Sequence, residues 1–240
     1  MAETVVLLHG FAGTRHGWDL VADRLDRERY RPLALDIRGH GTARDRRPIT
    51  FAACAADVAA AAPERFVLCG YSMGGRIALH VALAHPERVS RLVLVATTAG
   101  IPDPDERAAR RAADEALAAE IERGTIQDFA TRWTAQPLFA RTPPQAAAFW
   151  RSDLLRNDPR ALAAALRGLG PGAMTPLWDR LGELTMPATV LAGERDARFA
   201  TAGRHLAARL PAARLLIVPG GGHGLPREAP QAVAAAIGST

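Results

Sequence analysis

The sequence predicts an α/β domain with a mostly parallel six-strand sheet, helices on both faces and a helical cap inserted after the fourth strand. Short, continuously apolar runs alternate with helical stretches over residues 1–100 and again over residues 182–240, as in parallel sheets buried on both faces. Residues 101–181 between them show helical periodicity broken by prolines and no strand-like run. A chain of 240 residues suits one domain carrying such an insertion.

The first half holds four predicted strands and three predicted helices. The strands are residues 4–8, 31–36, 65–70 and 91–96. The helices are residues 18–25, 51–62 and 73–84; the second is alanine-rich and stops at Pro63, and the third ends at His85 and Pro86. We therefore expect residues 1–100 to form the first part of the sheet domain.

The second half resumes the same alternation after the cap. Strands are predicted at residues 188–192 and 214–218, and helices at residues 202–210 and 228–237. We expect residues 1–100 and 182–240 to form the core, and residues 101–181 to form the cap.

Composition and charge limit the classes of function. Hydrophobic residues make up 48% and charged residues 23% of the chain, which excludes disordered and fibrous proteins. The net charge is +5, and all 30 basic residues are arginines, scattered and mostly interleaved with acidic residues. The sequence contains no stripe of basic residues interleaved with aromatic ones, so its charge does not favour a nucleic-acid partner. The guanidinium group of arginine can instead bind a small carboxylate through two parallel hydrogen bonds.

The sequence also bears on location and cofactors. No apolar run approaches the roughly 18 residues of a membrane span, and the N-terminus lacks the basic region of a signal peptide. Cys54 and Cys69 are too few for a disulfide framework, and Cys69 reads as a buried thiol. We expect a cytoplasmic protein without a membrane partner, metal or cofactor, and leave its oligomeric state open between monomer and dimer.

The strongest local motif is Gly70-Tyr71-Ser72-Met73-Gly74, which fits G-x-S-x-G between a predicted strand and a predicted helix. That is the context of a nucleophile elbow, in which glycines allow strand and helix backbones to approach. The alternative interpretation is an ordinary glycine turn. The flanking strand and helix favour Ser72 as a reactive hydroxyl.

A reactive serine needs a base and a carboxylate that orients the base. Asp196 follows the fifth predicted strand and His223 the sixth, in the order Ser, Asp, His. Asp196 could instead cap a helix, with Glu194 as its nearest competitor, and His223 could be a loop histidine without a role. We predict Ser72, Asp196 and His223 as catalytic residues.

Developing negative charge needs donors held in place. In this architecture they are the backbone amides of Met73, after the nucleophile, and of Phe11, in the loop after the first strand. The alternative for His9-Gly10-Phe11 is a glycine turn packed by an aromatic ring, and both can hold together.

The motifs LLHGFAG, DIRGHG, GYSMGG, GERD and GGH, in this order and spacing, resemble the α/β-hydrolase superfamily over essentially the whole chain. That superfamily hosts esterases, lyases, dehalogenases and oxygenases without cofactors, so the fold alone does not fix the reaction. Ser72 argues against the branches that carry aspartate at the elbow.

The cap resembles one family more closely. ERAAR at residues 106–110, FATRW at 129–133, QPLF at 136–139 and LRN at 155–157 are similar to the 2-succinyl-6-hydroxy-2,4-cyclohexadiene-1-carboxylate synthases of menaquinone biosynthesis. Arg76 also matches their GYSxGGR pattern. The resemblance implies a lyase that eliminates pyruvate from 2-succinyl-5-enolpyruvyl-6-hydroxy-3-cyclohexene-1-carboxylate, with the Ser-His-Asp triad as base and without an acyl-enzyme.

The same resemblance implies binding residues for a small anionic carboxylate substrate. They are Tyr71, Arg76, Arg110, Trp133 and Arg156. We expect the three arginines to point into one cleft beside Ser72, with Trp133 on its wall. Each arginine could instead lie on a solvated helix face, and Trp133 could be simple core packing.

Two loops depart from the family pattern, and two other functions stay open. Residues 97–101 lack the usual Ser and Pro-Gly, and Pro226 stands where a second histidine is usual. One alternative is a carboxylesterase or carbon–carbon bond hydrolase that uses Ser72 as nucleophile; the arginines separate it from the lyase. The other is a non-catalytic binding scaffold, but such scaffolds usually lose a triad member and none is lost here.

Overall fold

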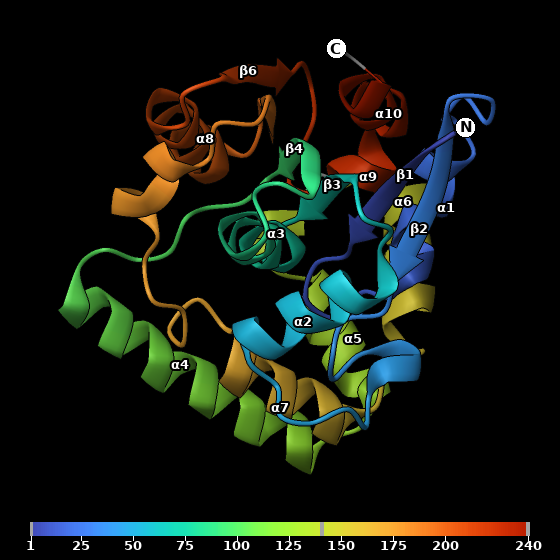
Figure 1. Cartoon of the computed structure of the whole chain (residues 1–240). Coiled ribbons are helices and arrows are strands. Elements are labelled where there is room, and N and C mark those ends of the chain that lie inside the picture. The colour runs from blue at the N-terminus through green and yellow to red at the C-terminus, as the bar shows by residue number, and fades with distance from the viewer. Residues whose placement is uncertain (1, 140–141, 239–240) are drawn as a thin grey trace.

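The computed structural model describes residues 2–139 and 142–238. Within them one sheet has the strand order β2-β1-β3-β4-β5-β6, with every neighbouring pair parallel (Figure 1). The strands are β1 (Glu3–Leu8), β2 (Tyr30–Leu35), β3 (Phe66–Tyr71), β4 (Val89–Val95), β5 (Ala188–Gly193) and β6 (Ala213–Val218). The predicted parallel sheet is confirmed, each strand lying within two residues of its predicted bounds.

Helices cover both faces of the sheet because successive strand side chains point to opposite sides. Val6 and Leu8 of β1 face one core with α2 (Phe51–Ala61), α3 (Met73–Ala84) and α8 (Ala197–Arg209). Val5 and Leu7 face a second core with α1 (Asp19–Ala22) and α10 (Pro230–Gly238). The predicted continuously apolar strands follow from this burial on both sides.

Three predicted helices differ from the observed ones. The helix predicted at residues 202–210 is α8, which begins five residues earlier, at Ala197, where the Asp196 side chain caps it. Residues 18–25 were expected to be helical, but the structure has a 3₁₀ turn, η1 (Arg15–Trp18), capped by the Thr14 hydroxyl, and then the short α1. The last predicted helix is divided into α9 (Leu225–Glu228) and α10 because Ala229 adopts a φ of −142° directly before Pro230. A residue before proline avoids the helical conformation.

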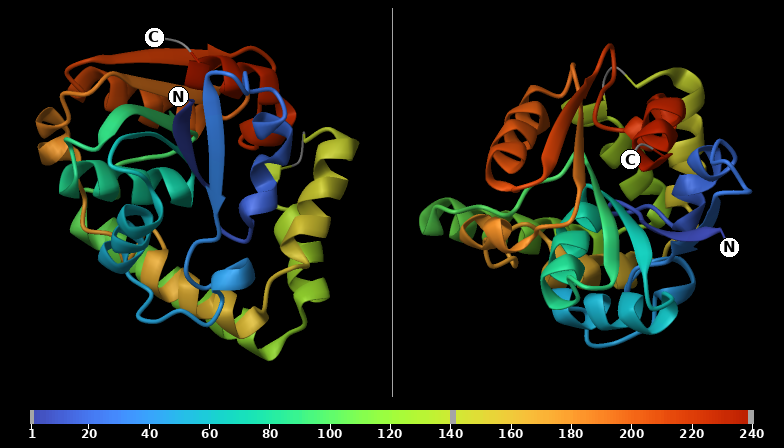
Figure 2. Two further views of the ribbon diagram at one scale, coloured as in Figure 1. Left: turned by 45° about the vertical axis from the view of Figure 1, so that its right-hand side comes forward. Right: turned by 45° about the horizontal axis from the view of Figure 1, so that its top comes forward.

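The segment between β4 and β5 contains helices joined by loops, and no strand, in its described part. It contains α4 (Pro104–Arg123), α5 (Ile126–Thr134), η3 (Pro137–Phe139), α6 (Pro144–Leu154), α7 (Pro159–Leu169) and η4 (Trp178–Glu183). Side chains of Asp103, Thr125 and Asp158 cap α4, α5 and α7. Figure 2 shows α4 and α7 side by side beneath the sheet, with α5 and α6 rising along one side. The inserted helices thus cover the end of the sheet where β3 meets α3.

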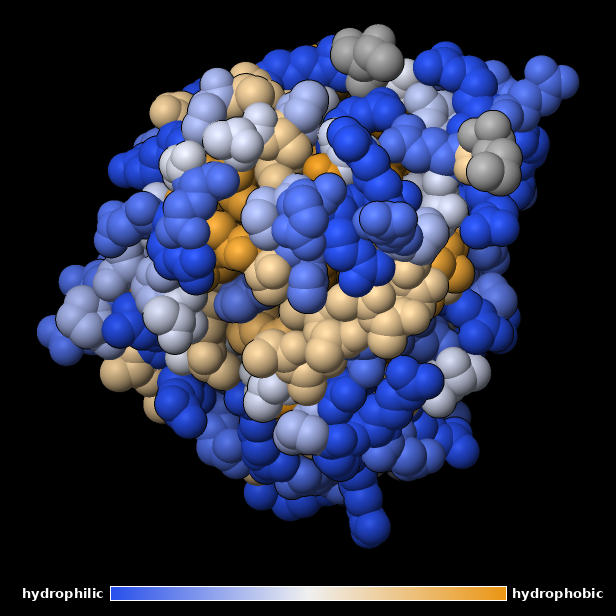
Figure 3. Space-filling model, viewed as in Figure 1, coloured by the Kyte–Doolittle hydropathy of each residue, from blue (hydrophilic) through white to orange (hydrophobic). Residues whose placement is uncertain are grey.

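The face of the molecule drawn in Figure 3 is mainly hydrophilic. A paler band crosses the face drawn in Figure 3 over α2, whose exposed residues include Ala52, Ala56 and Ala60. Among the described residues, the exposed large hydrophobic side chains are scattered: Leu138, Leu155 and Leu216. No helix in this part of the chain is both long and apolar enough to cross a membrane.

Both cysteines are buried free thiols, as predicted for Cys69. Burial raises the pKa of Cys54 to about 12 and raises that of Cys69 as well. Neither thiol is therefore activated as a nucleophile near neutral pH.

Candidate active site

Ser72 occupies a sharp turn between β3 and α3. Its φ of 52° lies in the left-handed region, which a residue with a side chain adopts only when its surroundings enforce it. A Cβ on Gly74 would lie 2.1 Å from the Leu8 carbonyl oxygen, and one on Gly70 would lie 2.3 Å from the Gly74 carbonyl oxygen. Only glycine permits this approach of α3 to the sheet, as the motif predicted.

Ser72, His223 and Asp196 form a chain of hydrogen bonds. His223 Nε2 lies 3.2 Å from Ser72 Oγ, and His223 Nδ1 lies 2.7 Å from Asp196 Oδ2. The His223 and Asp196 residues are only 3% and 5% exposed, so water competes little for these bonds. This arrangement can move a proton between Ser72 and His223.

The alternatives for the acidic residue are also settled by contacts. Asp196 Oδ1 accepts from the Phe199 amide at 3.4 Å, so the residue caps α8 as well as contacting His223. Glu194 accepts from the Gly220 amide at 2.8 Å and does not contact His223. Asp196 is therefore the carboxylate beside the histidine.

Two backbone amides beside Ser72 lack acceptors. Within the described residues, the N–H groups of Phe11 and Met73 donate to no protein atom, and both residues line the same cavity as Ser72. The Phe11 ring packs edge to face against Trp133, with ring centroids 5.3 Å apart. The Phe11 ring therefore packs as an aromatic side chain on this turn, and its backbone amide, without an acceptor among the described residues, belongs to a residue on the cavity wall.

Two buried histidines hold this loop in place. The Ile37 amide donates to His9 Nε2 at 3.0 Å, and the Ala12 amide donates to His40 Nε2 at 3.2 Å. Both rings therefore act as acceptors and must be neutral on that nitrogen. Burial, and next the neighbouring His9, lower the pKa of His40 to about 3; burial also lowers the pKa of His9.

We expect the free energy of unfolding to fall as the pH drops below about 6.5, the ordinary histidine value. In that range the unfolded chain binds protons that His9 and His40 exclude in the folded state, so acid favours unfolding until the pH nears the folded pKa. Urea denaturation at pH 7.5 and pH 5 measures the change. His40→Gln, whose amide oxygen can replace the acceptor, should reduce the dependence on pH; an undiminished dependence would contradict the assignment.

A cavity of about 490 Å³ lies between the sheet and the inserted helices, with Ser72 and His223 on its wall. Arg76 and Arg110 also line it, as predicted. Arg76 is buried, and its Nη2 donates to the Leu169 carbonyl at 3.0 Å. Its Nε has no partner. Burial, and next the nearby Arg110, lower the pKa of Arg76 to about 10, still well above neutrality.

Arg110 and a third arginine complete the positive side of this cavity. Arg110 Nε pairs with Asp114 at 2.8 Å, which fixes its guanidinium. Arg198, which the sequence analysis missed, lines the same cavity and lies near enough to Arg76 to lower its pKa. Its position two residues after Asp196 was the available signal. Glu106, which was not predicted as a site residue, also lines this cavity.

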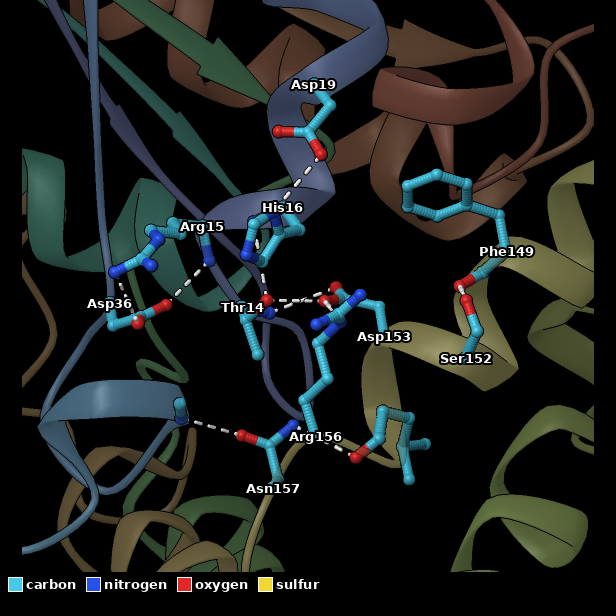
Figure 4. Close-up of polar contacts among 12 residues, drawn as sticks. Thr14, Arg15, His16, Asp19, Asp36, Phe149, Ser152, Asp153, Arg156 and Asn157 are labelled. Carbon is cyan, nitrogen blue, oxygen red and sulfur yellow. Dashed lines mark hydrogen bonds and ion pairs between the residues drawn. The ribbon is translucent and has the colours of Figure 1, made fainter.

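Arg156 does not line the Ser72 cavity, so its predicted place there is wrong. Its side chain is 57% exposed and its Nε lies 4.0 Å from Asp153, in a separate surface hollow shared with Arg15 (Figure 4). The turn after α6 directs Asn157 inward instead, where the amide donates to the Ala12 carbonyl at 3.0 Å. This inward contact leaves Arg156 on the outer side of the turn.

Tyr71 and Trp133 both line the cavity. The Tyr71 ring lies 5.4 Å from the His223 ring, centroid to centroid. The Trp133 ring also packs against the Phe129 ring, with centroids 5.4 Å apart. Trp133 therefore forms part of the cavity wall and also takes part in hydrophobic packing.

The two divergent loops border this region. Thr98, Gly100 and Ile101 line the Ser72 cavity, and the Thr97 hydroxyl donates to the Ser72 carbonyl at 2.7 Å. Pro226 lines a smaller neighbouring cavity. The described residues hold no group of three histidine, cysteine or acidic side chains placed to share a metal ion.

A parallel sheet, a serine on a strained turn after its third strand, and a histidine and aspartate from later loops define an α/β hydrolase. The chain belongs to the alpha/beta hydrolase family, whose model matches residues 5–236.

The relatives of this chain include enzymes named for two different reactions. A 2-succinyl-6-hydroxy-2,4-cyclohexadiene-1-carboxylate synthase of Klebsiella pneumoniae is 31% identical, with 97% of this chain and 91% of the relative aligned. A pimeloyl-[acyl-carrier protein] methyl ester esterase of Nitrosomonas europaea is 32% identical, over 91% of this chain and 88% of the relative. The structure of MenH from S. aureus matches with a TM-score of 0.90 and 28% identity, over 97% of this chain and 91% of that one.

Proposed function

We propose that this enzyme is a lyase that eliminates pyruvate from 2-succinyl-5-enolpyruvyl-6-hydroxy-3-cyclohexene-1-carboxylate, giving 2-succinyl-6-hydroxy-2,4-cyclohexadiene-1-carboxylate in menaquinone biosynthesis. The observation that carries the proposal is the buried Arg76 on the wall of the Ser72 cavity, with an unpartnered Nε. A buried guanidinium without a carboxylate partner favours an anionic ligand. A relative whose name is that of a synthase of the same product supports the proposal.

In this proposal Ser72 is the base. His223 takes the Ser72 proton and is held by Asp196, at the 3.2 Å and 2.7 Å separations given above. Ser72 Oγ then removes a proton from the substrate ring. The electron pair of that C–H bond forms a new ring double bond, the existing ring double bond moves by one position, and the ring C–O bond breaks. Pyruvate leaves as its enolate, which takes up the proton held by His223, and no acyl-enzyme forms.

The Phe11 and Met73 amides are the proposed oxyanion hole. Charge develops on the carbonyl or carboxylate oxygen next to the carbon that loses its proton. Two amides without protein acceptors, on the wall that carries Ser72, can stabilise that charge.

Arg76 and Arg110, joined by Arg198, are the proposed partners of the substrate carboxylates. Tyr71 and Trp133 are proposed to hold the ring of the substrate between them. Arg156 is left out of this set because it faces another surface.

A second candidate function is ester hydrolysis with Ser72 as nucleophile. The same three residues serve that reaction, and the esterase of Nitrosomonas europaea shows comparable identity. A small neutral ester, however, makes no use of the arginines in the cavity.

The test is to incubate the protein with the enolpyruvyl substrate and follow pyruvate release, beside p-nitrophenyl acetate as the ester control. The proposal expects a much larger kcat/KM for pyruvate release than for ester hydrolysis. Ester hydrolysis without pyruvate release would favour the esterase instead.

A further inference from the structure

A second group of unpartnered donors lies next to the Ser72 cavity. Among the described residues, four buried side-chain nitrogens lack a hydrogen-bond partner, and three of them are Trp18 Nε1, Trp150 Nε1 and Arg227 Nη1. All three residues line one small cavity, which we call the annex. Trp18 and Arg227 are only 1% and 8% exposed. Buried N–H groups normally find an acceptor, so three unused ones on residues that line the same cavity indicate a missing partner.

The annex is a side chamber of the Ser72 cavity. The two cavities share Gly10, Phe11, Tyr71, Trp133 and Trp150 on their walls. The annex gives the centres of water-sized atoms about 30 Å³, whereas one water needs roughly 10–15 Å³. It therefore has room for more than one oxygen atom, such as a carboxylate group.

Arg227 is held rigidly at this wall. Its Nη2 donates to Asp153 Oδ2 at 2.8 Å, and the guanidinium lies 4.0 Å from the centroid of the Phe149 ring. Asp153 also accepts from the amide and the hydroxyl of Thr14, as Figure 4 shows for the Thr14–Asp153 pair. Thr14 thus shares the carboxylate with Arg227, and Nη1 remains free for another acceptor.

The charge of Arg227 is only partly offset. Burial lowers its pKa to about 10 although Asp153 acts in the opposite direction. The guanidinium is thus still positive at neutral pH, and a further oxygen acceptor would stabilise it.

We infer that the annex binds the oxygen atoms at the end of a substrate side arm, to which Arg227, Trp18 and Trp150 donate. The arm enters from the Ser72 cavity past Tyr71. For the substrate proposed above, this arm is the succinyl chain with its terminal carboxylate; that identification rests on the proposed function. Ordered water is the competing occupant.

Gly17 offers a way to fill the annex without touching Ser72 or His223. It lines the annex, and a Cβ there would lie 3.4 Å from Arg227 Nη2 and 3.7 Å from Asp153 Oδ2, ordinary contact distances. Gly17→Ala should therefore fold and reduce the space for an arm. Gly182→Ala is the matched control, because its Cβ would meet nothing within 4 Å.

The probes are 2-succinylbenzoate and 2-acetylbenzoate, which share a ring carboxylate and a ketone but differ in the carboxylate-bearing end of the arm. Isothermal titration calorimetry gives Kd for each. The unsubstituted protein and Gly182→Ala should bind the succinyl compound roughly tenfold or more tightly than the acetyl compound. Gly17→Ala should lose most of that preference, and Trp150→Phe, which removes one N–H, should lose part of it.

A preference that survives in Gly17→Ala, or none in the unsubstituted protein, would overturn the inference and leave water as the occupant. The outcome is separate from the proposed function. Pyruvate release without the preference refutes only the annex, and the preference without pyruvate release refutes only the proposed reaction.

Discussion

Replacing Ser72 with alanine is expected to lower pyruvate release by several orders of magnitude, as the loss of a catalytic triad member does in other enzymes. The variant removes the hydroxyl that lies 3.2 Å from His223 Nε2, so no base reaches the substrate ring. Steady-state kinetics with the enolpyruvyl substrate measure the effect. Thermal unfolding serves as the control, because alanine differs from serine only by the lost hydroxyl group and should leave the fold intact.

His223→Gln should produce a loss of similar size, since the two residues act as one unit. An active Ser72→Ala protein would exclude the serine from the mechanism, whatever the effect of His223→Gln.

Replacing Arg76 with glutamine is expected to reduce kcat/KM for the anionic substrate roughly ten- to a hundredfold. Charge-assisted hydrogen bonds to a carboxylate contribute about 1.5–3 kcal/mol, and 1.4 kcal/mol corresponds to about tenfold. Hydrolysis of p-nitrophenyl acetate should hardly change, because a neutral ester makes no such contact. Arg110→Gln should show the same selectivity.

Arg156→Gln is the matched control for these variants. It makes the same chemical change on the outer side of the turn after α6, where the side chain is 57% exposed. Both activities should stay at the level of the unsubstituted protein. A lower kcat/KM for the anionic substrate in Arg156→Gln, with no change in Arg76→Gln, would contradict the placement of the binding arginines.

The sheet and the serine elbow were predictable because both depend on local sequence. Continuous apolar runs indicate strands that are buried on both faces of the sheet. The glycines at positions 70 and 74 indicate a close approach of the strand and helix backbones. The order Ser, Asp, His also predicted which side chains the structure brings together. Asp196, predicted in preference to its neighbour Glu194, is the carboxylate that contacts His223.

The arginines were harder because their placement depends on packing between distant segments. The family resemblance placed Arg156 in the substrate cleft, because it could not show that Asn157 would turn inward to bind the Ala12 carbonyl. Arg198 was missed because the side-chain direction of a residue at the start of α8 depends on how the helix meets the inserted segment. The annex was also out of reach, since Trp18, Trp150 and Arg227 come from three distant parts of the chain.

The mass of the ring product tests the proposed elimination most directly. Elimination removes the ring oxygen with pyruvate and leaves a conjugated cyclohexadiene. Hydrolysis of the enol ether would instead release pyruvate with an oxygen from water and leave a hydroxyl on the ring. Mass spectrometry of the product mixture after complete conversion should show the diene alone. A ring product heavier by one water would contradict the lyase and show that the enzyme is a hydrolase.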